Sequence, residues 1–350
     1  MKFKNIISLN RQMITLCKKL SFPRNEENNI TKKKIITDEI EDIKASKKLI
    51  FPEFEDIKVS TKTFIAMSNL TINLQKLFEF LPTTAYIVIP KKRGRKKKLE
   101  FIDPNIGVKS GSILTMKYEN NLKGVDLKQK KSQNKKKSTK WFRNSFTVVI
   151  LIDSKPINFK ICQNGMFQIT GIKVDSQAED CIKYIWGYIK DHKDIYSLSR
   201  SDKLEVLFIP AMRNIDFSVG FNIDREKLTN YMNTQTEYHS LLETSFGYTG
   251  INIKMKINQD IVTMAVKKIT FIDEKWVENM TTYEEYISHL SEKERMKKIL
   301  KERYTTFLVF HSGKIIVSSS CAEFARDSYY FFLEIIRKSY HIIKEKLDVI

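Results

Sequence analysis

Two runs rich in lysine and arginine are the clearest chemical feature of this sequence. Residues 91–98 contain seven positive residues and residues 128–140 contain seven lysines, together 14 of the formal net charge of +20. Such a basic chain favours a polyanionic partner, because neutralising phosphates releases their counterions. An isolated lysine run is about as often a solvated loop without a partner. The charge therefore favours a nucleic-acid partner without excluding plain loops.

Residues that could carry catalysis or hold a metal are scattered. The five histidines are His192, His239, His289, His311 and His341. The sequence contains no HExxH, no paired Cys/His spacing and no GxxxxGK[ST] loop. Residues 312–315 (SGKI) lead into an apolar, strand-like run, which indicates a hairpin turn and not a phosphate-binding loop. We therefore expect a binding protein that is not an enzyme, with no catalytic residue, metal or cofactor.

The cysteines and the hydropathy pattern indicate an intracellular protein. Cys17, Cys162, Cys181 and Cys321 are far apart, form no CxxC pair and lie in or near apolar patterns, as reduced core cysteines do. No apolar run reaches 18 residues, and the first 20 residues are too charged for a signal peptide. We expect a soluble protein without a membrane partner.

One pattern occurs twice and predicts the elements that would position a binding surface. Residues 304–338 read as an apolar run, a Ser-Gly turn, a second apolar run and an amphipathic helix, and residues 157–190 repeat this order. Their turn glycines, Gly165 and Gly313, are 148 residues apart. Alternation in the second hairpin places Leu308 and Phe310 on the face opposite Phe307 and Val309. We predict an α+β fold made of two tandem repeats.

The remaining segments complete this predicted organisation. Residues 1–50 form a mixed-charge N-terminal extension, residues 51–195 the first repeat and residues 196–350 the second. Residues 83–140 are predicted to be a basic insertion with two strands of its own, one of them at 112–118. Residues 258–303 are predicted to be a second insertion, with a strand at 262–272 and a charged helix near 284–301.

These features resemble the TATA-box-binding protein family, as a divergent member similar to those of large DNA viruses. The resemblance rests on FTVVILIDSKPINFKICQNGMFQITGIK (146–173), TTFLVFHSGKIIVSSS (305–320) and AMRNIDFSVGFNIDREKL (211–228), and it covers roughly 55–190 and 204–340. It implies a pseudo-twofold saddle, a curved antiparallel sheet with helices on its convex face. It also implies a transcription initiation factor that binds and bends A·T-rich promoter DNA through the minor groove and recruits general factors and RNA polymerase. The nucleus, or a viral replication compartment in the host cytoplasm, would then be its location.

The resemblance also implies which residues contact double-stranded DNA. Positions of the family's wedge phenylalanines fall on Phe146, Tyr248, Phe310 and Cys162. Positions that read the groove fall on Gln168 with Thr170, Ile316 with Ser318, and Asn214, whose first-repeat counterpart is Thr61 or Thr63. Positions near strand ends that would bind phosphates are Arg143, Lys173, Lys254 and Lys256.

Two further expectations concern charged residues. Arg93-Gly94-Arg95 is similar to the core of an AT-hook, but the motif is weak, and a nuclear-import signal and a plain basic loop are together the more common explanation. Lys183, Lys190 and Arg326 would lie on the convex face and be available to partner proteins. Two alternatives to a transcription factor stay open: a non-specific architectural DNA-binding protein, and a non-catalytic saddle domain of a DNA-processing enzyme.

Overall fold

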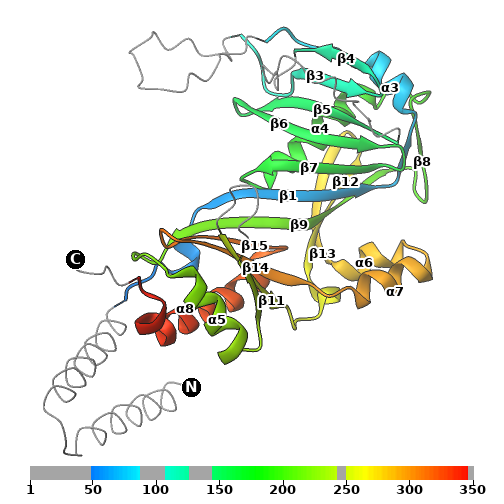
Figure 1. Ribbon diagram of the computed structural model, residues 1–350. Helices are drawn as coiled ribbons and strands as arrows, with labels where there is room; N and C mark the ends of the chain where they lie inside the picture. Colours follow the sequence, from blue (N-terminus) through cyan, green and yellow to red (C-terminus); the bar gives the residue numbers. More distant parts are fainter. Residues whose placement is uncertain (1–48, 87–106, 126–143, 243–249, 346–350) are drawn as a thin grey trace, which may run out of the picture.

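The computed structural model describes residues 49–86, 107–125, 144–242 and 250–345 as an α+β protein built on one large antiparallel sheet (Figure 1). Two strands that are far apart in sequence, β1 (Val59–Ser68) and β9 (Leu204–Ser218), lie side by side in its middle. Both strands are rich in β-branched and aromatic residues, which favour a pleated surface.

Five strands continue the sheet beyond β1, and four continue it beyond β9. The order beyond β1 is β7, β6, β5, β3 and β4 (Met166–Ile172, Lys155–Cys162, Ser145–Ile152, Ile113–Tyr118, Asn121–Gly124). The order beyond β9 is β15, β14, β11 and β10 (Lys314–Ser319, Tyr304–Phe310, Gly250–Lys256, His239–Leu242). We call these the first and second halves of the sheet. A short separate sheet pairs β2 (Leu70–Ile72) with β8 (Tyr196–Leu198).

Helices cover one face of the sheet in each half. The first half carries α3 (Leu74–Phe80) and α4 (Ser176–Ile189), and the second carries α5 (Arg225–Gln235) and α8 (Ala322–Ile343). Apolar residues at three- and four-residue spacing on α4 and α8 pack on alternate residues of the strands, which makes one large apolar core under each pair of helices. None of the helices in the described ranges has the length and apolar character needed to cross a membrane.

The two predicted hairpins are present, and their turn glycines are in equivalent surroundings. Gly165 lies between β6 and β7 with φ +71°, and Gly313 lies between β14 and β15 with φ +72°. A Cβ atom would come within 2.2 Å of the carbonyl oxygen of Leu70 at the first glycine, and within 2.1 Å of that of Phe221 at the second. Positive φ and backbone contact together leave glycine as the residue that fits both turns.

The strand predicted within the first insertion belongs to the main sheet. β3 pairs with β5 along its length, from Ile113 opposite Ile150 to Lys117 opposite Thr147, and β4 pairs with its other edge. Its residues Leu114 and Met116 are fully buried. Residues 113–124, which were expected to lie within an insertion, therefore contribute two strands to the main sheet. The two lysine runs lie outside the described residues.

Residues 258–303, which were predicted to be a second insertion and are called the second insertion below, contain more secondary structure than expected. β12 (Ala265–Ile272) pairs with the first part of β9, Leu204–Phe208, whereas β15 pairs with its last part, Arg213–Ser218. β13 (Lys275–Thr282) pairs with β12. One charged helix was expected, and two are present, α6 (Tyr283–Ser288) and α7 (Glu292–Leu300). Ser291 separates them because its side chain forms a capping box with Glu294 at the start of α7. Figure 1 shows the hairpin leading from β9 to these helices.

Candidate nucleic-acid interface

The sheet face opposite the four covering helices is only partly covered, and we call it the open face. In β14, Phe307 and Val309 are fully buried under α8, where the Phe307 ring stacks on Phe332 at 4.3 Å. The alternate residues Leu308 and Phe310 are half-buried on the other side. The alternation predicted from sequence for this hairpin is therefore confirmed, and a ligand of the sheet would meet Leu308 and Phe310.

A row of polar side chains crosses the open face of the second half. Cross-strand pairing joins Lys254 of β11 to Thr306 of β14, Thr306 to Ser318 of β15, Ser318 to Asn214 of β9, and Asn214 to Thr61 of β1. Directly paired residues project from the same face of a sheet, with Cβ atoms about 4.5–5.5 Å apart. We call these five residues the polar row. It combines an amide, three hydroxyls and one ammonium group without any carboxylate.

Asn214 lies near the middle of the sheet with unused hydrogen-bonding capacity. Its Oδ1 atom is inaccessible to solvent and has no partner among the described residues, and Oδ1 of Asn252 on β11 is in the same condition. A buried amide oxygen without a partner costs about 1–3 kcal/mol. Asn214 itself is half-buried on the open face, and its amide group carries a hydrogen-bond donor as well as this acceptor.

The first half carries a related set of residues on its open face. Gln168 is exposed, and Thr170 is half-buried with its hydroxyl donating to the carbonyl of Asn158 at 3.1 Å. Thr170 pairs with Thr63 of β1, which makes Thr63 a better counterpart of Asn214 than Thr61. Cys162 is half-buried near the end of β6, and burial raises the pKa of its thiol. The thiol is therefore un-ionised at neutral pH.

An apolar patch lies next to the polar row. Leu308 pairs with Ile316, both half-buried, and Phe310 pairs with Gly250 at the start of β11. A Cβ atom on Gly250 would come within 2.7 Å of Leu308 Cδ1. The missing side chain thus makes room for Leu308 on the open face. Leu308, Phe310 and Ile316 form the part of this face that could lie against base pairs.

Phe146 is not on this face, contrary to the expectation for it. Its side chain is 1% exposed and packs edge-on against Phe78 of α3 at 6.3 Å and against Tyr118 at 6.2 Å. The reason is strand alternation, because Phe146 pairs with the buried Ile161 and projects to the helix-covered side together with Val148. Phe146 is a core residue and is withdrawn as a candidate wedge.

The expected phosphate contacts are in different situations. Lys173 is exposed just after β7, and Lys254 is exposed on the open face. Lys256 pairs with Glu302 at 2.7 Å, so its charge is partly used within the protein. Arg143 and Tyr248, like Arg93 and Arg95, lie outside the described residues, and the roles expected of them stay predictions.

The second insertion covers part of the open face. Tyr283, Tyr286 and Ile287 of α6 form an apolar cluster with Leu207 and Ile209 of β9, against which Ile65 and Met67 of β1 also pack. The sequence indicated that Tyr286, Leu290 and Ile299 would face the protein body, and all three belong to or pack on this cluster. It did not indicate that they would cover the sheet face proposed for DNA. The uncovered part of that face includes the polar row and the apolar patch.

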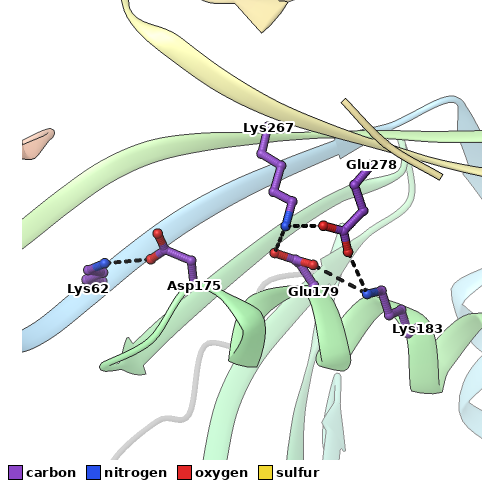
Figure 2. Close-up of polar contacts among 6 residues, drawn as sticks. All are labelled: Lys62, Asp175, Glu179, Lys183, Lys267 and Glu278. Carbon is purple, nitrogen blue, oxygen red and sulfur yellow. Dashed lines mark hydrogen bonds and ion pairs between the residues drawn. The ribbon is translucent and has the colours of Figure 1, made fainter. Parts of the chain in front are cut away.

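The hairpin of the same insertion is fixed to α4 by ion pairs (Figure 2). Lys267 of β12 lies 2.6 Å from Glu179 and 2.7 Å from Glu278, and Lys183 lies 3.3 Å from each of the same carboxylates. The Glu179 side chain is 6% exposed, so this network is partly shielded from water. The hydrogen bond from Lys267 lowers the pKa of Glu278, and Lys183 lowers it further. The Glu278 carboxylate is therefore charged at neutral pH.

Side chains expected to be available for partner proteins are engaged in such contacts. Lys183 belongs to the network just described, Lys190 pairs with Glu274, and Arg326 pairs with Glu55 at 2.6 Å. The three side chains remain partly exposed in these ion pairs, and the role in partner binding expected of them stays a prediction.

Some residues of the interface were missed from the sequence. Thr306 belongs to the polar row, and Asn158 lies at the corresponding place of the first hairpin, 148 residues earlier. The 148-residue offset between the two turn glycines also relates Asn158 to Thr306, so comparing the first strands of the two hairpins at this offset would have identified both residues. The repeat offset gives no information about the basic residues of the insertion, Lys298, Lys301 and Arg303. The sequence around them does not indicate that they lie close to the sheet. No group of three or more metal-binding side chains comes together in the described ranges.

Comparisons with known proteins give a relative without an assigned function and a distant solved structure. No family model matches the sequence. "Uncharacterized protein 335L" of Invertebrate iridescent virus 6 is 32% identical over 200 residues, which are 54% of this chain and 59% of that protein. The chain thus matches less than two thirds of the relative's length. The solved structure "Methanococcus jannaschii TBP" aligns with 82% of this chain and 99% of its own, at 12% identity and a TM-score of 0.40.

Proposed function

We propose that this chain is a TATA-box-binding-protein-like transcription initiation factor, which binds and bends A·T-rich promoter DNA through the minor groove. In this proposal the open face contacts the DNA, and other surfaces recruit general factors and RNA polymerase. The protein would act where viral or nuclear genes are transcribed. It would do so as a binding protein, without a catalytic centre, metal or cofactor.

The polar row is the observation that carries this proposal. The minor groove of an A·T pair presents hydrogen-bond acceptors, and a G·C pair adds the N2 amino donor of guanine. The amide nitrogen of Asn214 and the hydroxyls of Ser318 and Thr306 offer small hydrogen-bond donors on directly paired strands of the open face. Leu308 and Phe310 beside them provide the apolar surface that can enter an opened base step. A plain basic protein would need neither set.

The first helix of each half begins with an equivalent hydrogen bond, which supports a tandem repeat. In each half a short polar residue begins the first helix: Asn73 accepts from the Lys76 amide, and Asp224 accepts from the Lys227 amide, both at 3.1 Å. The equivalent surroundings of Gly165 and Gly313 agree with the same arrangement. We propose that the two halves are copies of one unit, joined through β1 and β9, with the helices on the convex side of a saddle.

Two other functions fit parts of these observations. A non-specific architectural DNA-binding protein would use the same basic charge, but it would not need a row of small hydrogen-bond donors beside an apolar patch. A saddle domain of a DNA-processing enzyme would need a catalytic partner elsewhere. Neither is favoured by a specific observation in the described residues.

The proposal is tested by replacing Asn214 and measuring sequence preference. Asn214→Ala should lower affinity for an A·T-rich duplex more than for a G·C-rich one, because direct readout is lost, at a cost of about 1–3 kcal/mol. Asn230→Ala, on the exposed side of α5, is the matched control and should change neither affinity. Fluorescence anisotropy with labelled duplexes measures both. An unchanged ratio of the two affinities for Asn214→Ala would contradict minor-groove readout at this residue.

A further inference from the structure

A basic cleft lies between the second insertion and the uncovered part of the open face. It has a volume of about 620 Å³, and its floor includes Thr306 and Ser318 of the polar row. Its cationic lining residues are Lys254 of β11, Lys298 of α7, and Lys301 and Arg303 just beyond α7. The cleft therefore joins the insertion to the surface that we propose for DNA.

The charge of the cleft is positive. The acidic residue in its lining is Glu302, whose carboxylate lies 2.7 Å from Lys256 Nζ and accepts from the Tyr304 hydroxyl at 2.5 Å. The hydrogen bond from Lys256 lowers the pKa of Glu302, so the carboxylate stays ionised and paired. Lys254 and Lys301 take part in none of the ion pairs between described residues. Four cations thus face one acid that is already neutralised.

Arg303 organises the insertion side of the cleft. Its guanidinium donates to the carbonyl oxygens of Lys298 at 2.9 Å and Lys301 at 3.0 Å, and it lies over the Tyr283 ring at 5.8 Å. The last carbonyls of a helix carry a partial negative charge that disfavours anions. By donating hydrogen bonds to these carbonyls, Arg303 reduces their repulsion of a bound anion. Its contact with Tyr283 also holds the end of α7 against α6. The Ser320 hydroxyl in the lining is also inaccessible to water and has no partner among the described residues.

We propose that this cleft binds the phosphodiester backbone of the duplex that lies on the open face. The inference rests on the proposed function and adds the second insertion to its DNA-binding surface. Ammonium and guanidinium groups with nearby hydroxyls are the groups that hold phosphates in such interfaces. Because Lys254 and Thr306 belong both to the cleft and to the polar row, a backbone in the cleft borders the bases that Asn214 would read.

The test compares two double variants at α7 and its C-terminal end. Lys298→Gln with Lys301→Gln removes two cleft charges, whereas Lys293→Gln with Lys297→Gln removes two exposed charges of α7 that do not line the cleft. Affinity for an A·T-rich duplex is measured by fluorescence anisotropy over a series of salt concentrations. Each lost phosphate contact should reduce the slope of log affinity against log salt by about 0.9. The cleft variant should lose about 1.8 in slope and keep its preference for A·T over G·C.

The possible outcomes separate this inference from the proposed function. An unchanged slope in the cleft variant, or an equal loss in the control, would overturn the cleft while DNA binding by the wild-type protein still stood. If the wild-type protein binds no duplex, the proposed function fails. Calorimetric titration with inorganic polyphosphate then tests phosphate binding by the cleft alone. Weaker polyphosphate binding by the cleft variant than by the control would support the cleft as a phosphate site. Equal binding would refute it.

Discussion

Phe307 and Phe310 lie on the same strand and on opposite faces, which makes them a matched pair for testing how the open face works. Phe307→Ala would remove a fully buried ring stacked on Phe332. Such a truncation lowers the free energy of unfolding by about 3–5 kcal/mol, because it removes the burial energy and also leaves a cavity. Burial of a whole Phe side chain by itself contributes about 1.5–3 kcal/mol. Phe310 is only half-buried, so Phe310→Ala should cost on the order of 1 kcal/mol.

For DNA binding and bending, we expect Phe310→Ala to have the larger effect and Phe307→Ala the smaller one. If Phe310 enters a base step, it offsets an unstacking cost of a few kcal/mol. Losing about 1.4 kcal/mol of that contact would weaken binding tenfold and reduce the bend. Phe307→Ala should leave the bend unchanged wherever the protein is still folded, because its ring lies under α8.

Thermal unfolding of the free protein and fluorescence energy transfer across an end-labelled A·T-rich duplex measure these effects. At about 2–4 °C per kcal/mol, Phe307→Ala should lower Tm by roughly 10 °C and Phe310→Ala by only a few degrees. The reasoning is refuted if Phe310→Ala leaves the bend intact and lowers Tm as far as Phe307→Ala does.

The remaining predictions concern the first half, the insertion and the basic runs. Cys162→Phe should increase the bend measured by energy transfer, because it places an aromatic ring at the position in the first hairpin that corresponds to Phe310; a smaller bend would count against this correspondence. The hairpin contact with α4 should weaken as pH falls below 4.5, the ordinary value for Glu278, because a carboxylate with a lowered pKa stabilises the fold only while it is ionised; tryptophan fluorescence should report this transition, and Glu278→Gln should abolish it. Deletion of residues 91–98 and 128–140 should weaken DNA binding and flatten its salt dependence but keep the A·T preference, and loss of that preference in a competition assay would contradict a purely electrostatic role.

Much of the fold could be predicted from the sequence because the pattern is local and occurs twice. The glycines at 165 and 313 mark turns, and the change from two-residue to three- and four-residue spacing after each hairpin marks the helices. β13 could not be predicted in this way. Most of its residues are exposed, and it pairs only with β12, so no alternation of apolar and polar residues marks it.

The candidate site was harder to predict, for two physical reasons. Residues 148–152 are apolar at every position, so alternation does not reveal which face the neighbouring Phe146 takes. The packing of Tyr286 on Leu207 and Ile209 joins residues about 80 positions apart, and it depends on the path of β12 along β9. Local spacing carries no information about such a contact. The sequence therefore predicted an apolar face on the insertion without indicating the surface that it covers.

The central claim, that the open face reads the minor groove, is tested most directly with three duplexes of equal length: A·T-rich, G·C-rich, and the G·C duplex with inosine in place of guanine. Inosine lacks the N2 amino group, so an I·C pair presents only acceptors in the minor groove, as A·T does, while its major groove stays that of G·C. Affinity of the wild-type protein is measured by anisotropy at one fixed salt concentration. The account predicts that the I·C duplex binds like the A·T duplex and more tightly than the G·C duplex. Equal affinity for the I·C and G·C duplexes, with A·T bound more tightly than both, would show that the minor-groove donor is not what the protein reads.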